Sequence, residues 1–114
     1  MINSELLKGS MVTLILKTLQ KKPMYGYQIM KELVGSSGGH LEVKEGTLYP
    51  ILHSLETDGA VESEWSQDQG ERRRKYYKLT KKGRALLKEK ASQWEAFRSV
   101  MDKVLAIERT AYET

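Results

Sequence analysis

Two stretches of the sequence combine side chains that can bind a polyanion. Residues 71–82 carry one acid, Glu71, and seven basic residues: Arg72, Arg73, Arg74, Lys75, Lys78, Lys81 and Lys82. Residues 46–59 read GTLYPILHSLETDG and place polar or ring side chains beside an apolar stripe: Thr47, Tyr49, Pro50 and His53. Ammonium and guanidinium groups neutralise phosphates, and hydroxyl and imidazole groups can hydrogen-bond phosphates or base edges. Together the two stretches indicate a nucleic-acid-binding surface.

The stretch 46–59 is predicted to be a helix that buries one face. Its apolar residues follow the i, i+3, i+4, i+7 pattern of an amphipathic helix: Leu48, Ile51, Leu52 and Leu55. Gly59 ends the helix, because glycine suits the left-handed C-terminal cap. If the helix begins at Gly46 or Thr47, Pro50 lies in its first turn, where a missing N–H breaks no helical bond.

Apolar periodicity and turn residues predict the other elements. In chain order these are a helix from Asn3 or Ser4 to about Gln20, a helix over 24–34, a loop over 35–40, a brief strand over 41–43, the helix described above, a β-hairpin of strands 60–65 and 72–79 around Gly70, and a helix from about Lys81 to past Ile107. The first helix is apolar around most of its circumference, which indicates burial on more than one side.

This order predicts a mostly α fold with a small β-hairpin, arranged as a winged helix-turn-helix. We expect residues 1–80 to form a DNA-binding domain and residues 81–114 to form a C-terminal dimerisation helix. In such a fold the third helix enters the major groove, and the hairpin, or wing, lies along the backbone or the minor groove. The predicted DNA-binding residues are Tyr25, Lys44, Thr47, Tyr49, Pro50, His53, Arg72, Arg73, Arg74 and Lys75.

Two features of this predicted site stay open from the sequence. Tyr49 and His53 either face the DNA groove or pack on a neighbouring element. Side chains of a strand alternate between its two faces, so only one of two pairs of basic residues in the wing can face the DNA. These pairs are Arg72 with Arg74 and Arg73 with Lys75.

The last helix carries apolar residues at a spacing close to that of a coiled-coil seam. The residues of this predicted interface, with one from the first helix, are Leu87, Trp94, Met101, Phe97, Val104 and Leu6. They predict a homodimer whose recognition helices meet the two half-sites of a palindromic operator. The alternative is that the helix folds back on its own domain. Trp94 either packs in the dimer core or lines a cavity for flat aromatic ligands.

Length and composition exclude several other classes of protein. At 114 residues with 39% hydrophobic content, the chain predicts one small domain. The absence of cysteine excludes a disulfide scaffold, a thiolate metal site and a cysteine nucleophile, and two histidines disfavour a His-rich metal site. The apolar run 11–16 is too short to span a membrane, and no phosphate-loop, HExxH or GxSxG motif occurs. We expect a cytoplasmic protein that is not an enzyme and uses no metal or cofactor.

Three blocks of the sequence resemble the signature blocks of the PadR family of bacterial transcriptional regulators. They are YGYQIMKEL (25–33), EGTLYPILHSLETDGAVES (45–63) and RRRKYYKLTKKGRALL (72–87). The single C-terminal helix is similar to that of the smaller PadR subfamily. The resemblance implies a dimeric winged-helix repressor of nearby detoxification or efflux genes. Some such members release DNA on binding phenolic acids or hydrophobic drugs, and in multidrug-binding members a tryptophan of the C-terminal helix stacks on the drug at the dimer interface. Trp94 stands in a similar place.

Two further hypotheses come from other classes. Winged-helix folds also serve as protein-docking modules without DNA, but such a module would more often carry an apolar or mixed patch where this chain has a basic wing. A small-molecule or catalytic pocket at the dimer interface is the other hypothesis. Fluorescence quenching by flat aromatic compounds that is lost in Trp94→Ala would support binding there.

Overall fold

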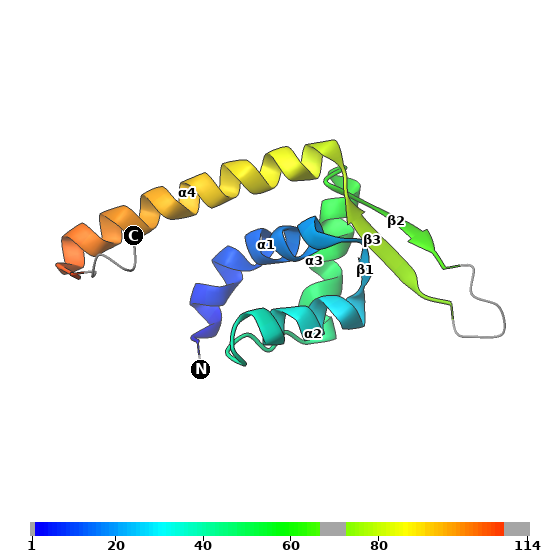
Figure 1. The fold of residues 1–114 in the computed structure, drawn as a ribbon, viewed down its shortest axis with the longest axis horizontal. Helices are drawn as coiled ribbons and strands as arrows, with labels where there is room; N and C mark the ends of the chain where they lie inside the picture. Colours follow the sequence, from blue (N-terminus) through cyan, green and yellow to red (C-terminus); the bar gives the residue numbers. More distant parts are fainter. Residues whose placement is uncertain (1, 67–72, 109–114) are drawn as a thin grey trace.

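A computed structural model describes residues 2–66 and 73–108 of the chain. Its elements, shown in Figure 1, are α1 (Ser4–Lys21), β1 (Met24–Tyr25), α2 (Gly26–Ser36), α3 (Glu45–Thr57), β2 (Val61–Trp65), β3 (Lys75–Leu79) and α4 (Lys81–Leu105). The predicted mostly helical winged fold with a long last helix is confirmed. Arg72, one of the predicted DNA-binding residues, lies outside the described residues.

The sheet has three antiparallel strands in the order β1-β3-β2, one more than the predicted hairpin. Met24 and Tyr25 were expected at the start of the second helix, but they pair with Tyr77 and Tyr76 of β3. Helix α2 begins only at Gly26, because Tyr25 has an extended backbone, with φ −89° and ψ 166°, and forms the N-cap of the helix. Pairing with β3 then satisfies the backbone groups of this short segment.

The strand predicted at 41–43 does not form. Leu41 and Val43 are buried in the core and Glu42 between them is exposed, so the alternation reflects burial rather than strand pairing. Neither of the two strand pairings in the described residues includes residues 41–43.

Three element boundaries also differ from the prediction. Helix α3 begins at Glu45, so Pro50 lies beyond its first turn and leaves the carbonyl of the exposed Gly46 without its helical donor. Strand β3 begins at Lys75 rather than at residue 72. Helix α4 ends before Ile107, because Ala106 adopts the left-handed conformation with φ 56° and its N–H caps the last turn.

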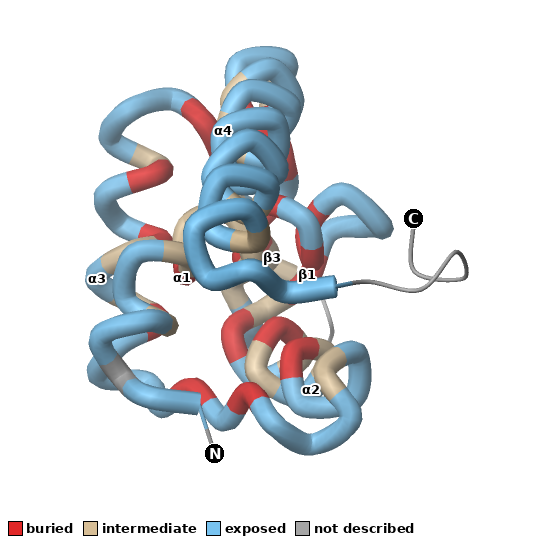
Figure 2. The backbone as a smooth tube through the Cα atoms, turned by 90° about the vertical axis from the view of Figure 1, so that its left-hand side faces the viewer, coloured by how far each residue is buried: buried red, intermediate tan, exposed pale blue. Residues whose placement is uncertain are grey.

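The core lies where α1, α2 and α3 meet the sheet (Figure 2). Helix α1 contacts α2, α4 and β3, in agreement with the expected burial on more than one side. The most enclosed side chains come from every layer: Ile15, Leu16, Ile29, Leu48, Leu52, Val61 and Tyr77. The apolar stripe of α3 thus attaches that helix to the core and leaves its opposite side available.

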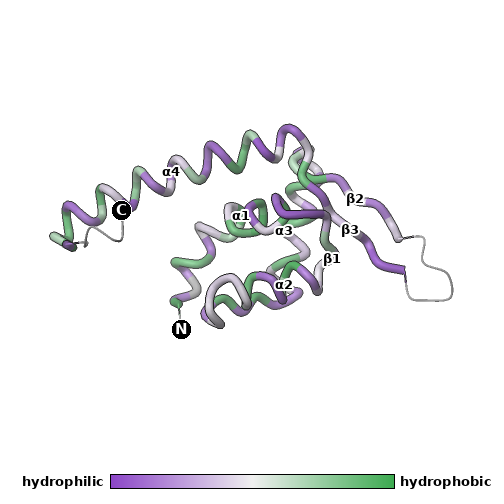
Figure 3. Tube along the Cα trace, viewed as in Figure 1, coloured by the Kyte–Doolittle hydropathy of each residue, from purple (hydrophilic) through white to green (hydrophobic). Residues whose placement is uncertain are grey.

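Helix α4 packs on the domain only through its first part. Gly83 and Leu87 are buried, the middle of the helix borders a groove against α1, and its last turns extend beyond α1 (Figure 1). The molecule is elongated, with extents of 57 × 28 × 26 Å. Apolar and polar residues alternate along this extension (Figure 3). Across residues 2–66 and 73–108, no helix combines the length and apolar character needed to cross a membrane.

Candidate nucleic-acid interface

A groove of about 690 Å³ separates the start of α2 and the side of α3 from the wing, which is the hairpin of β2 and β3. Six predicted DNA-binding residues line it: Tyr25, Tyr49, His53, Arg73, Arg74 and Lys75. The structure therefore brings together the two stretches that residue type and spacing singled out. Their juxtaposition arises because β3 pairs with β1, the strand that leads into α2.

The remaining predicted residues lie elsewhere on α3 and before it. Lys44 and Thr47 line a separate hollow of about 520 Å³ beside the start of α1, together with Lys8. Pro50 is exposed on α3 and does not line the groove. The exposed surface around α3 therefore has two sides, and only the side of Tyr49 and His53 faces the wing.

Tyr49 both packs on a neighbouring element and lines the groove. A Cβ atom at Gly26 would lie only 2.1 Å from the Tyr49 hydroxyl oxygen, so the glycine makes room for the tyrosine ring. The ring is partly buried against the core, whereas His53, one turn further along α3, is exposed. This role of Gly26 was not predicted from the sequence. The signal was present in the Tyr-Gly-Tyr stretch, but only the tertiary contact reveals what the glycine accommodates.

Two arginines at the distal end of the wing, where Trp65 pairs with Lys75, are each held by an aromatic ring. The Arg73 guanidinium lies 5.3 Å from the centre of the Trp65 ring, and that of Arg74 lies 4.7 Å from the centre of the Tyr25 ring. Such cation–π contacts orient a guanidinium while leaving its N–H donors available to phosphates. Trp65, which was not predicted as a site residue, therefore belongs to the candidate interface and also lines the groove.

Lys75 has a different environment. Its ammonium lies 3.6 Å from the Glu56 carboxylate of α3 and 5.5 Å from the centre of the Tyr77 ring. Glu56 also accepts a hydrogen bond from the Ser63 hydroxyl of β2. This hydrogen bond, and then the charge of Lys75, hold the pKa of the Glu56 carboxyl below its usual value, although partial burial opposes them. Burial raises the pKa of the Tyr77 hydroxyl, so the tyrosine stays neutral beside them.

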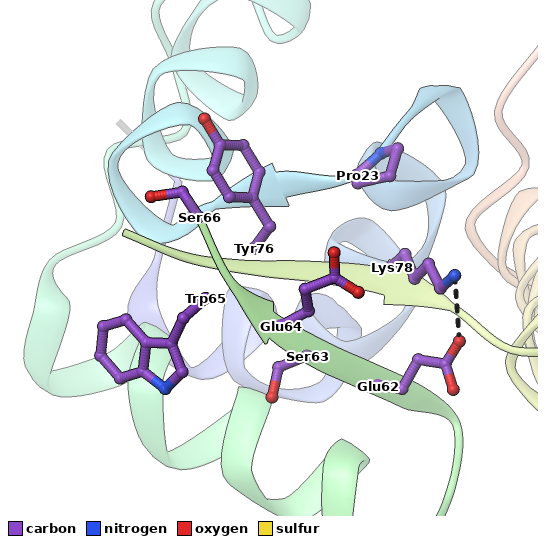
Figure 4. A pocket seen from close by; sticks show the side chains of 8 residues that line it. All are labelled: Pro23, Glu62, Ser63, Glu64, Trp65, Ser66, Tyr76 and Lys78. Carbon is purple, nitrogen blue, oxygen red and sulfur yellow. Dashed lines mark ion pairs between the residues drawn. The ribbon is translucent and has the colours of Figure 1, made fainter. Parts of the chain in front are cut away.

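The two faces of the wing differ in charge. Strand register places Ser63, Trp65, Lys75 and Tyr77 on the inner face, which meets α3, and Glu62, Glu64, Tyr76 and Lys78 on the outer face. The outer face surrounds a hollow of about 420 Å³, where Lys78 pairs with Glu62 at 3.2 Å (Figure 4). Two carboxylates on this face would repel a phosphate backbone, so the inner face and the distal end of the wing suit DNA better.

A second, apolar region lies between α1 and α4. Leu6, Trp94 and Phe97 line a groove of about 640 Å³ between the two helices, and Trp94 also borders a smaller hollow of about 350 Å³ together with Leu87. Leu6 is 72% exposed, Trp94 49% and Val104 77%. Leu87, predicted for the dimer seam, is already buried in the core of its own chain, because the first part of α4 packs there. Met101 remains exposed with the others.

Taken together, three helices, a small antiparallel sheet and a basic groove between the third helix and the hairpin define a winged-helix DNA-binding protein. The model of the transcriptional regulator PadR-like family matches residues 15–89, and the chain belongs to this family. The resemblance seen in the three sequence blocks is thereby confirmed, and the protein is a DNA-binding transcriptional regulator.

Similar proteins agree with this assignment. A transcriptional regulator from Clostridium thermocellum is 32% identical, with a TM-score of 0.83 over 90% of this chain and 97% of that one. A PadR family transcriptional regulator from Eggerthella lenta is 37% identical, with a TM-score of 0.74 over 89% of this chain and 82% of that one. Transcriptional regulator Rv3488 of Mycobacterium tuberculosis is 51% identical over 47 residues, which are 41% of this chain and 43% of that protein.

Proposed function

We propose that the protein is a homodimeric repressor that binds a palindromic operator. Helix α3 enters the major groove, where Tyr49 and His53 face the bases, and the distal end of the wing contacts the backbone or minor groove through Arg73 and Arg74. The observation that carries this proposal is the single groove that gathers side chains of α3 and of the wing. Lys44, Thr47 and Pro50 would contact the DNA on the other side of α3.

Dimerisation through residues 81–114 is supported by the apolar surface that α4 leaves uncovered. The exposed large apolar residues of this helix are Trp94, Phe97, Val100, Met101, Val104 and Leu105. Contiguous apolar surface of this kind marks a protein interface, and α1 adds Leu6 at the edge of the same region. A second copy of the chain would cover both helices and place two copies of α3 for two half-sites.

A small aromatic or hydrophobic effector would bind beside Trp94 and release the DNA. The support is the half-exposed indole, which borders an apolar groove on one side of α4 and a smaller hollow on the other. A flat ring system can stack on such an indole. This site lies on α4, away from the DNA groove, so the effector would act through the arrangement of the two copies.

The effector site has a direct spectroscopic test. The chain contains two tryptophans, so Trp65→Phe and Trp94→Phe variants separate their signals. Quenching of fluorescence by flat aromatic compounds is expected to persist in the Trp65→Phe variant, which retains Trp94, and to disappear in the Trp94→Phe variant. Quenching that follows Trp65, or no quenching across a diverse panel, would contradict an effector site beside Trp94.

DNA binding is tested by titrating a palindromic upstream fragment and random DNA at several salt concentrations. Because Arg73 is placed for a phosphate, Arg73→Ala is expected to weaken binding to both DNAs alike and to reduce the slope of log K against log[salt] by about 0.9. The matched control is Lys78→Ala, since Lys78 pairs with Glu62 on the outer face of the wing. An equal loss of slope in both variants would contradict the assigned face, and salt-independent or absent binding by the wild-type chain would contradict the function.

A further inference from the structure

The last turn of α3 is joined to both strands of the wing through one carboxylate. Ser63 of β2 donates its hydroxyl hydrogen to Glu56 Oε2, and Lys75 Nζ of β3 lies 3.6 Å from Glu56 Oε1. Ser63 and Lys75 share the inner face of the wing because Ser63 lies opposite Tyr77. Each oxygen of Glu56 therefore engages a different strand, and the carboxylate couples the recognition helix to the wing.

This ion pair is better shielded than an ordinary surface pair. The side chains of Lys75 and Glu56 are 32% and 34% exposed, and the ammonium also lies over the Tyr77 ring. Two further titratable groups lie near Glu56: His53, one turn earlier on α3, and the hydroxyl of Tyr77. The hydrogen bond from Ser63 and the charge of Lys75 keep the pKa of the Glu56 carboxyl low. The carboxylate is therefore ionised at neutral pH and compensates the charge of the Lys75 ammonium.

Lys75 thereby differs from its two neighbours at the distal end of the wing. Arg73 and Arg74 lie over neutral rings, and in the described part of the chain neither forms an ion pair with a carboxylate. The neutral rings leave the charges of the two guanidinium groups uncompensated, whereas Glu56 largely compensates the charge of the Lys75 ammonium. A phosphate that approaches the wing would therefore be attracted mainly by the two arginines. The arrangement reduces the sequence-independent attraction of the wing to DNA.

We propose that Glu56 is a specificity-determining residue of the DNA-binding surface: it holds the wing against α3 and keeps Lys75 away from phosphates. This inference rests on the proposed function. Non-specific affinity arises almost entirely from phosphate contacts, whereas operator affinity also depends on base contacts. Withholding one ammonium therefore lowers binding to random DNA more than binding to the operator, provided that the wing keeps its position relative to α3.

The test uses Glu56→Gln, Lys75→Gln and the double variant in the full chain. Glutamine retains a hydrogen-bonding oxygen for Ser63 and removes the charge, so the fold is expected to persist. Affinities for the operator and for random DNA are measured across a salt series. Glu56→Gln is expected to steepen the salt slope by about 0.9 and to strengthen random-DNA binding about three- to tenfold, with a smaller gain for the operator. A purely structural role for Glu56 would weaken binding and would not steepen the slope.

The double variant shows whether Lys75 carries the effect. Lys75→Gln is expected to reduce the salt slope by about 0.9 more in the Glu56→Gln background than in the wild-type background. Equal reductions in both backgrounds mean that Lys75 already contacts phosphate in the wild-type protein and would overturn the inference. An unchanged slope and an unchanged operator preference in Glu56→Gln would overturn it as well.

A measurement without DNA separates this inference from the proposed function. In urea unfolding of the same variants, the double variant is expected to be less destabilised than the sum of the two single variants, because each single change already removes the pair. Additive destabilisation means that Glu56 does not hold Lys75 and overturns the inference even if the protein binds DNA. If the two substitutions are coupled in unfolding but the wild-type protein binds no DNA, the proposed function is contradicted. The contact between α3 and the wing is then still supported.

Discussion

Gly83→Ala is expected to destabilise the fold by about 3 kcal/mol, which is at the upper end for overpacked sites. A Cβ atom at this position would lie 1.9 Å from the carbonyl oxygen of Ala60 and 3.2 Å from Leu79 Cδ2. The carbonyl cannot retreat freely, because it accepts a hydrogen bond from the Thr80 N–H at 3.1 Å. Thermal unfolding at fixed protein concentration should show a Tm lower by on the order of 10 °C.

The surrounding contacts explain why this junction responds so strongly. The Thr80 hydroxyl caps α4 by accepting from the Gly83 N–H at 3.1 Å and donates to the Gly59 carbonyl at 2.6 Å. Lys82 Nζ donates to the Asp58 carbonyl at 2.6 Å. The start of α4 is thus attached to the turn between α3 and β2, and a side chain at Gly83 would push the two apart.

Gly46→Ala is the matched control for this prediction. Gly46 also lies in the first turn of a helix, but among the described residues no atom beyond its own helical turn lies within 4 Å of the place that a Cβ would take. Alanine there is expected to stabilise the protein by about 0.5–1 kcal/mol, because helical glycine loses more conformational entropy on folding. Equal effects of the two substitutions would show that α4 does not approach Ala60 as closely as described.

Phe97→Asp is expected to convert the proposed dimer to a monomer and to weaken operator binding by about 100-fold or more. Phe97 is exposed at the middle of the apolar surface of α4 and borders the groove towards α1. A carboxylate there would be desolvated in the dimer without a partner, which disfavours association. Loss of the dimer removes the second half-site contact, so the operator is bound by one copy of α3. Analytical ultracentrifugation and operator titration measure the two effects.

Ser99→Asp is the control on the same helix. Ser99 is exposed and lies about 200° around the helix from Phe97, on the side away from the apolar surface. The Ser99→Asp substitution adds the same charge to α4. It should leave the association state unchanged and the operator affinity within about twofold of the wild-type value. A dimer that persists in Phe97→Asp would mean that another surface joins the copies.

Much of the fold follows from local patterns in the sequence. The i, i+3, i+4, i+7 spacing of Leu48, Ile51, Leu52 and Leu55 identified α3, and alternation identified the hairpin. The errors occurred where two patterns with different causes look alike. Residues 41–43 alternate because Leu41 and Val43 are buried, and Met24 and Tyr25 read as helical although a distant strand pairs with them.

The residues of the candidate interface also fall into two groups: those that the sequence predicted and those that only the structure revealed. Residue type and clustering alone singled out Tyr49, His53 and the basic run of the wing as DNA contacts. Trp65, which orients Arg73, was missed because the contact depends on the strand register at Lys75. Gly26 was missed because its role is to leave space for the Tyr49 ring from another helix.

The sequence by itself determined the order of the elements, the basic character of the wing and the apolar surface of α4, because these depend on neighbours along the chain. Only the tertiary structure decided that β1 completes the sheet, that Tyr49 rests on Gly26 and that Glu56 engages Lys75. Each of these contacts joins residues far apart in the chain, and their partners are selected by strand register and helix packing, which no local periodicity encodes.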